Sequence, residues 1–245
     1  MSPHPLSVDQ LERIEAPVGP PTRAGLIGEV GTVLQPLRLA FGAPMLRRAP
    51  RGDGRVSFVL PGWKAPELTT APVRAYLGKL GHDARSWGLG VNRGDVEATR
   101  DEMAERVIAV AEATGRPVNL IGWSLGGVVS REIARMAPEA VHRVVTYGTP
   151  AVGGPTFTAG HAAFGADECI RITQLQQVLD ATEPIRRPIT AIFTRNDTVV
   201  DWRACIDRTS PSVRMVEVGS THVGLGFDPD VWLIVADALA EKDNV

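Results

Sequence analysis

The chain has 245 residues, 44% of them hydrophobic, which is enough to fill the core of one α/β domain. Its formal net charge of −2 and pI of about 6.2 speak against nucleic-acid binding through a basic surface. The only two cysteines, Cys169 and Cys205, make neither a disulfide framework nor a metal site, so no metal and no cofactor is expected.

Residues 1–54 are predicted to form an N-terminal extension. The N-terminus has no basic segment followed by an apolar stretch, so no secretory signal is predicted and a cytoplasmic location is expected. Between Ala24 and Gly42, apolar residues recur at helical spacing but are interrupted by polar ones, which argues against a membrane span. This predicts an amphipathic helix packed on the core, the alternative being an element that contacts lipid or shields the mouth of a site.

From residue 55 to residue 245 the patterns of strand and helix alternate. Residues 55–60 and 118–121 have the apolar runs of buried strands, and Asp95 is a predicted N-cap of a helix that ends at Gly115. This alternation predicts an α/β fold with a mostly parallel sheet covered by helices on both faces.

The segment Gly122-Trp123-Ser124-Leu125-Gly126 lies between a predicted strand and a predicted helix. A sharp turn from strand to helix needs small residues on both sides of the serine, because a Cβ there would meet the neighbouring backbone. The turn would expose the Ser124 hydroxyl at a helix N-terminus, where a nucleophile is well placed. The alternative is a tight connection with an incidental serine.

Two later strands also end in polar turns. The strand 189–193 is followed by Asp197, and the strand 213–218 is followed by His222. The carboxyl ends of parallel strands share one edge of a sheet, so Ser124, Asp197 and His222 are predicted to meet there.

Each of these three residue types has a defined role in acyl transfer. Serine is a weak nucleophile unless a base takes its proton, and His222 is the predicted base. Asp197 is predicted to orient the imidazole and stabilise its charged form. Asp201 is the competing acid, although its place directly before residues 202–206 is better explained as a helix N-cap.

Acyl transfer also needs hydrogen-bond donors for the negative oxygen that develops on the carbonyl. The predicted donors are the backbone amides of Leu125, directly after the serine, and of Trp63, in the turn that follows the strand 55–60. Gly62 lets this turn approach a ligand closely. Gly62, Trp123 and Trp87 are predicted to bind substrate, the alternative being that these tryptophans belong to the core.

With these motifs, the chain resembles the α/β-hydrolase superfamily, and in particular its small bacterial lipases and esterases, over roughly residues 55–240. The serine, aspartate, histidine order is that of the family. Residues 60–63 resemble its oxyanion turn, with Pro61 where many members carry histidine, which removes one support of that turn. Residues 87–94 and 147–150 also resemble segments of this group. The absence of a His-Gly-Gly-Gly motif argues against the hormone-sensitive-lipase branch.

Residues 151–188 interrupt the regular alternation of strand and helix. They contain scattered apolar residues between a Gly-Gly-Pro and an Arg-Arg-Pro sequence. This segment is predicted to be a small cap whose apolar side lines an acyl pocket. An ordinary crossover helix with an extended loop is the alternative.

These features favour a serine hydrolase that cleaves carboxylic esters with an apolar acyl group through an acyl-enzyme. The expected partner is a small-molecule or lipid ester, with no nucleic acid, no integral membrane association and only peripheral lipid contact. An acyltransferase with the same residues is the first alternative, and a non-catalytic binding protein is the second. The serine in place of an aspartate disfavours the dehalogenase type of relative.

Overall fold

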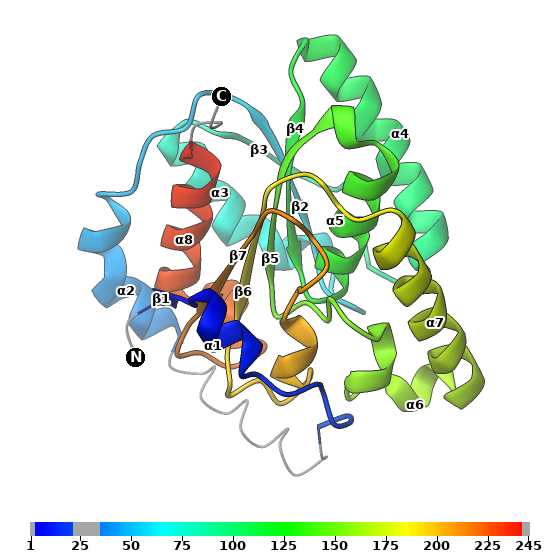
Figure 1. Cartoon of the computed structure of the whole chain (residues 1–245). Helices are drawn as coiled ribbons and strands as arrows, with labels where there is room; N and C mark the ends of the chain where they lie inside the picture. The colour runs from blue at the N-terminus through cyan, green and yellow to red at the C-terminus, as the bar shows by residue number, and fades with distance from the viewer. Residues whose placement is uncertain (1–2, 22–34, 242–245) are drawn as a thin grey trace.

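Seven strands form one sheet in the order β1-β7-β6-β5-β4-β2-β3 in the computed structural model, which describes residues 3–21 and 35–241 (Figure 1). Strand β1 pairs with β7 in the antiparallel sense, and every other neighbouring pair is parallel. The predicted mostly parallel sheet is therefore confirmed. The strands are β1 His4–Pro5, β2 Val56–Leu60, β3 Asp83–Ser86, β4 Val118–Trp123, β5 Val141–Tyr147, β6 Ile189–Phe193 and β7 Val213–Glu217.

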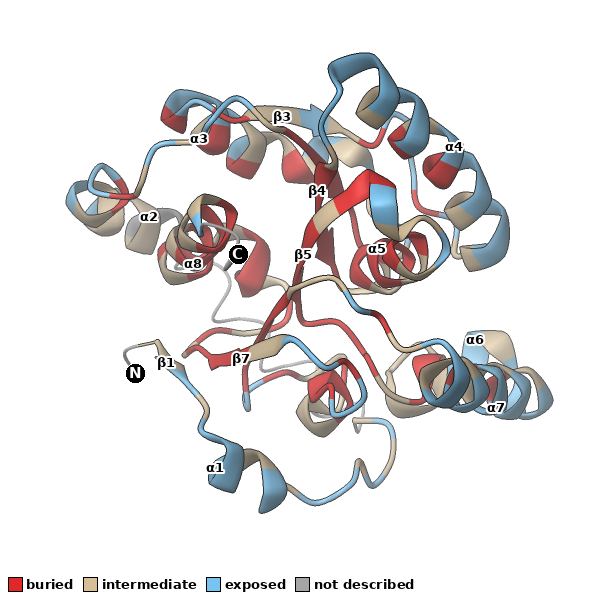
Figure 2. Ribbon diagram, turned by 45° about the horizontal axis from the view of Figure 1, so that its top comes forward, coloured by how far each residue is buried: buried red, intermediate tan, exposed pale blue. Residues whose placement is uncertain are grey.

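Helices cover both faces of this sheet, with α3 and α8 on one side and α4 and α5 on the other (Figure 2). The α-helices are α1 Val8–Glu12, α2 Gln35–Leu46, α3 Ala71–Leu80, α4 Val96–Thr114, α5 Leu125–Met136, α6 His161–Phe164, α7 Ala166–Thr182 and α8 Pro229–Ala240. The short 3-10 helices are η2 Glu67–Thr70, η3 Pro138–Ala140, η4 Gly154–Phe157, η5 Trp202–Cys205 and η6 Gly224–Phe227.

Strands β2, β4 and β6 are buried along their whole length, and most of their side chains are apolar, because helices cover both faces of the sheet. In β2, Phe58 and Leu60 pack into the cluster under α4 and α5, whereas Val59 packs into the cluster under α3 and α8. This division follows from the alternation of side chains along a strand. The sheet thus separates two apolar layers, as expected for an α/β domain.

The predicted boundaries of the helix between Asp95 and Gly115 agree with the structure. Helix α4 begins after Asp95, whose side chain accepts a hydrogen bond from the amide of Ala98, and it ends at Gly115 with a φ of 66°. A left-handed residue in this place is the common C-terminal signal of a helix.

The N-terminal segment is hydrogen-bonded to the main domain. Strand β1 pairs with β7, and the amide of Leu6 donates to the carbonyl of Met215 at 2.9 Å. Of the helix predicted over 24–42, the part from Gln35 onward lies in α2, which packs against α8, and residues 22–34 lie outside the described residues. In the described ranges, no helix is long and apolar enough to cross a membrane.

Helix α5 lies close to the sheet because its first turn is built from glycine. A Cβ on Gly126 would lie 2.4 Å from the carbonyl oxygen of Leu60 in β2. A Cβ on Gly122, at the end of β4, would lie 2.3 Å from the Cα of Gly127. Both distances are too short for real atoms, so the contact between β4, β2 and α5 depends on these glycines.

A buried ion pair joins the middle of α5 to the segment between β6 and β7. Arg131 donates to Asp207 at 2.5 Å, and both side chains are almost fully buried. The other carboxylate oxygen of Asp207 accepts the amides of Thr209 and Ser210. Burial alone would raise the pKa of Asp207, but Arg131 and the hydrogen bonds from Ser210 outweigh it and hold that pKa well below its ordinary value.

We expect Asp207→Asn to lower the free energy of unfolding by about 3 kcal/mol at neutral pH, because Arg131 would keep a buried charge without its counterion. The carboxyl group of Asp207 has a lower pKa in the folded protein than in the unfolded protein, so its ionised form stabilises the fold above the unfolded-state pKa. This stabilisation is lost as the pH falls below about 4 and the carboxylate takes up a proton. Urea unfolding at several pH values measures both effects. The control is Asp53→Asn, at an exposed pair with Arg116, which should cost less than about 1 kcal/mol. Equal losses in the two variants would contradict this assignment.

Gly126→Ala should lower the free energy of unfolding by about 2 kcal/mol or more, because the new methyl group meets main-chain atoms that cannot rotate away. The matched control is Gly78→Ala, in α3, where a Cβ has nothing within 4 Å. That substitution should stabilise the protein by about 1 kcal/mol, the helix preference of alanine over glycine. Denaturant unfolding of both variants tests the close approach, and a neutral Gly126→Ala would refute it.

Candidate active site

Ser124, Asp197 and His222 meet at the carboxyl edge of the sheet, following β4, β6 and β7 respectively. Nε2 of His222 lies 3.1 Å from Oγ of Ser124, and Nδ1 of His222 lies 2.7 Å from Oδ2 of Asp197. Asp197 and His222 are buried. The three predicted residues are thus connected by hydrogen bonds in one line.

The backbone of Ser124 is held in an unfavourable conformation. Its φ of 53° and ψ of −121° lie outside the regions that an L-residue prefers. The amide of Ser124 donates to the carbonyl of Tyr147, and its carbonyl accepts from Oγ1 of Thr149 at 3.0 Å. These contacts with the end of β5 hold the strained turn. Thr149 was not among the predicted site residues, since a hydroxyl that binds main chain has no distinctive sequence pattern.

The carboxylate of Asp197 is fixed by the main chain around it. Its Oδ1 accepts hydrogen bonds from the amides of Val199 at 2.9 Å and Val200 at 2.7 Å, so Oδ2 is left for the imidazole. Asp201 instead accepts from the amide of Arg203 and caps η5, as expected from its position. The structure therefore pairs the histidine with Asp197.

The contacts of His222 define how its ring can carry a proton. Because the carboxylate of Asp197 only accepts, Nδ1 of His222 donates to it, and Nε2 then faces the serine with a lone pair. The indole Nε1 of Trp123 donates to the carbonyl of His222 at 3.3 Å and fixes the loop from the other side. This arrangement suits removal of the hydroxyl proton by His222.

The turn after β2 lies directly beside the serine. A Cβ on Gly62 would lie 3.3 Å from Cβ of Ser124, so glycine permits the close approach expected of it. In the described part of the chain, the backbone amides of Trp63 and Leu125 donate to no protein acceptor. They are the two amides that the sequence predicted as donors to a substrate oxygen.

Asn92 supports this turn in place of the histidine that the sequence lacks. It is buried, and its Nδ2 donates to the carbonyl of Pro61 at 2.9 Å. Its backbone carbonyl accepts from the amide of Lys64, and its backbone amide donates to the carbonyl of Ala65. Asn92 belongs to the segment 87–94 that resembles other hydrolases, but one asparagine in a loop gives no sign of this role by itself.

A cavity of about 580 Å³ opens beside Ser124 and His222. It is lined mostly by apolar groups, which come from the turn after β2, from α5 and from the segment 151–188. Gly62, Trp63, Trp123 and Leu125 line it as predicted. Further apolar lining residues are Val96, Val128, Pro150, Pro155, Phe164, Ile172, Leu175, Leu179, Val199, Val200 and Val223. Charged residues also line the cavity, namely Asp95, Glu97, Arg100, Glu132, Glu168 and Arg171.

Trp87 is not part of this cavity, contrary to its predicted place among the substrate-binding residues. Its ring is only 1% exposed and belongs to the apolar cluster with Met103 and Val107, and its Nε1 donates to the carbonyl of Gly90. The segment 87–94 turns this side chain inward and brings Asn92 to the site. A sequence pattern does not reveal which side of such a loop faces the core.

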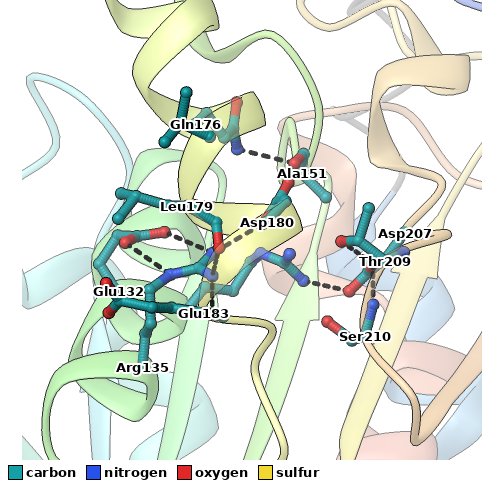
Figure 3. Close-up of polar contacts among 12 residues, drawn as sticks. Glu132, Arg135, Ala151, Gln176, Leu179, Asp180, Glu183, Asp207, Thr209 and Ser210 are labelled. Carbon is teal, nitrogen blue, oxygen red and sulfur yellow. Dashed lines mark hydrogen bonds and ion pairs between the residues drawn. The ribbon is translucent and has the colours of Figure 1, made fainter.

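Arg135 fastens the end of α7 to α5, as Figure 3 shows. It donates to the carbonyls of Leu179 and Glu183 and forms an ion pair with Asp180 at 2.6 Å. A cation at this position also interacts favourably with the negative end of a helix. The first half of α7 is bound to the segment around η4, where Oγ1 of Thr173 donates to the carbonyl of Gly153 at 3.1 Å, and Arg171 adds an exposed contact of 3.6 Å with Glu97 of α4.

Comparison with known proteins agrees with this architecture. No family model matches the chain. One curated relative, the pimeloyl-[acyl-carrier protein] methyl ester esterase of Methylococcus capsulatus (strain Bath), is 49% identical over 51 residues, which are 21% of this chain and 18% of the relative. The matched part is thus a small share of either protein.

Solved structures match much more of the chain at low sequence identity. A structure from the study of the metagenome-derived lipolytic enzymes LipS and LipT has a TM-score of 0.57 and 16% identity, covering 78% of this chain and 94% of that one. Lipase B of Aspergillus fumigatus has a TM-score of 0.60 and 20% identity, with coverages of 80% and 57%. The α/β-hydrolase domain-containing protein 10 of mouse has a TM-score of 0.51 and 17% identity, with coverages of 78% and 90%.

The parallel sheet, its two helical layers and these structural matches lead to one conclusion about the fold. The chain has the α/β-hydrolase fold, and its structural neighbours include lipases and esterases.

Proposed function

We propose that this protein is a serine hydrolase of the esterase or lipase type that cleaves carboxylic esters with an apolar acyl group. The hydrogen-bonded line from Ser124 through His222 to Asp197 carries this proposal. The lipases and the methyl ester esterase among the similar proteins support ester hydrolysis as the general reaction.

In this mechanism, Oγ of Ser124 attacks the ester carbonyl carbon while Nε2 of His222 takes the hydroxyl proton. The carbonyl oxygen becomes negative and accepts hydrogen bonds from the amides of Leu125 and Trp63. His222 then passes its proton to the leaving alcohol, and an acyl-enzyme remains. Water activated by the same histidine attacks the acyl group, which releases the acid and restores Ser124.

The environment of the carboxylate supports the role of Asp197. The two backbone amides on its Oδ1 hold the carboxylate so that Oδ2 faces Nδ1 of His222, where it favours the imidazolium that develops on the ring. Asp197 thereby orients the ring and stabilises its charge without taking up the proton.

The cavity indicates an apolar acyl group. Val128 of α5 and Ile172, Leu175 and Leu179 of α7 face it at helical spacing, and such side chains offer no partner to a sugar or a charged peptide. We place the acyl chain between these two helices. In this proposal, residues 151–188 act as a cap that shields the acyl-enzyme from water.

Ser124→Ala should reduce kcat on p-nitrophenyl esters at least about a thousandfold, because the residues of such a triad act as a unit. Esters from acetyl to palmitoyl should be compared, and the chain length with the highest kcat/KM separates an esterase from a lipase. Unfolding curves of the variant and the wild type serve as the control for folding. Near-normal hydrolysis by Ser124→Ala would disprove the mechanism, and faster release when alcohol is added would identify an acyltransferase.

Asp197→Asn should lower kcat about ten-thousandfold, because an amide can hold His222 in the wrong tautomer and cannot stabilise its charge. Asp201→Asn is the matched control, since it changes a carboxylate four residues away that caps η5, and it should change kcat less than tenfold. Steady-state kinetics on the best p-nitrophenyl ester measures both. The reverse ranking would assign the acid to Asp201.

A further inference from the structure

One wall of the cavity includes a residue with a buried hydrogen-bond acceptor that has no partner among residues 3–21 and 35–241. Gln176 of α7 lines the cavity and is 9% exposed. Its Oε1 is buried and accepts no hydrogen bond from the part of the chain that the structure describes. An acceptor buried without a partner costs about 1–3 kcal/mol, so its presence among apolar side chains needs a reason.

The amide orientation of Gln176 follows from its other contact. Nε2 lies 2.7 Å from the carbonyl oxygen of Ala151, in the segment that follows β5. A carbonyl only accepts hydrogen bonds, so the nitrogen must face Ala151 and the oxygen must face away from it (Figure 3). The protein therefore holds an acceptor in a defined direction.

The neighbouring polar groups at this part of the cavity are already neutralised. Glu132 of α5 also lines the cavity, and its carboxylate is bound by Arg135, which pairs with Asp180 as well. A cationic ligand group would thus find the carboxylate of Glu132 already paired, and an anionic one would meet the acceptor of Gln176. A neutral donor fits this environment best.

We propose that Gln176 is a specificity-determining residue and that its Oε1 accepts a hydrogen bond from a hydroxyl group on the acyl chain of the substrate. This inference rests on the proposed ester hydrolysis at Ser124. The substrate class is then a hydroxylated aliphatic ester, which places its hydrocarbon against Val128 and Leu175 and its hydroxyl against Gln176.

The helices limit how far this hydroxyl lies from the ester. The cavity follows α5 from Leu125 to Glu132, a rise of about 10 Å at 1.5 Å per residue. Arg135 joins the ends of α5 and α7, so Gln176 lies along this same length. Acyl chains from hexanoyl to decanoyl therefore cover the range of lengths that could place a terminal hydroxyl group beside Gln176.

The experiment compares methyl hexanoate, octanoate and decanoate with their ω-hydroxy counterparts by pH-stat titration. For at least one chain length, the wild type should show a kcat/KM about tenfold higher for the hydroxylated ester, as expected when a buried acceptor gains its partner. Monomethyl suberate, which carries a carboxylate in the hydroxyl position, should be a poorer substrate than methyl octanoate. A wild type with no preference at any length would overturn the inference without any variant.

Gln176→Met removes the acceptor while keeping the length of the side chain and a good helix former. It should bring the kcat/KM ratio of hydroxylated to plain ester down to about one. Gln177→Met, at the exposed next position of α7, is the matched control and should leave the ratio and both rates unchanged. A parallel loss on both esters in Gln176→Met would show that the residue only anchors Ala151, and would overturn the proposal.

The outcomes also separate this inference from the proposed function. Hydrolysis that disappears in Ser124→Ala but shows no preference for hydroxylated esters would leave the esterase standing and refute the role of Gln176. Hydrolysis of none of these esters, by wild-type protein that is folded, would count against both.

Discussion

The arrangement of the candidate site depends on one close approach, that of α5 to strands β4 and β2. Glycines at 122, 126 and 127 leave no room for a Cβ, so the first turn of α5 lies against the ends of both strands. This contact forces Ser124 into its strained backbone conformation and sets its hydroxyl above the sheet edge. The contacts of His222 and the position of the turn at Gly62 follow from where that hydroxyl lies.

The other loops of the site are also joined by hydrogen bonds from side chains to the main chain. Asn92 binds the turn at Pro61, Thr149 binds the carbonyl of Ser124, and Thr194 donates to the carbonyl of Ser220 in the loop before His222. These side chains connect loops that follow different strands. Because each bond fixes direction as well as distance, the donors and acceptors of the site are placed before a ligand arrives, which is the condition for electrostatic catalysis.

Helix α7 is bound at both ends, by different contacts. Arg135 is nearly buried and binds the last turn of α7 through two carbonyls and a carboxylate. The first half of α7 is bound to the segment around η4, where Thr173 donates to the carbonyl of Gly153 and Thr156 donates to the carbonyl of Cys169, and the exposed contact of Arg171 with Glu97 adds little. The proposed acyl-binding face lies between these ends. Contacts on both sides of Gln176 therefore hold this residue in place along the helix.

The sequence by itself determined the parallel sheet and the order of its principal elements, and it pointed to Ser124, Asp197 and His222 as the candidate site residues, because short glycine-rich and polar turns after apolar strands are local patterns. It also explained Asp201 as a cap, since an N-cap is a contact within a few residues. Only the tertiary structure decided that Trp87 is a core residue, that Asn92 supports the turn at Pro61 and that Gln176 faces the cavity. Each of these depends on which side of a loop or helix meets a segment distant in sequence, and no local spacing encodes that.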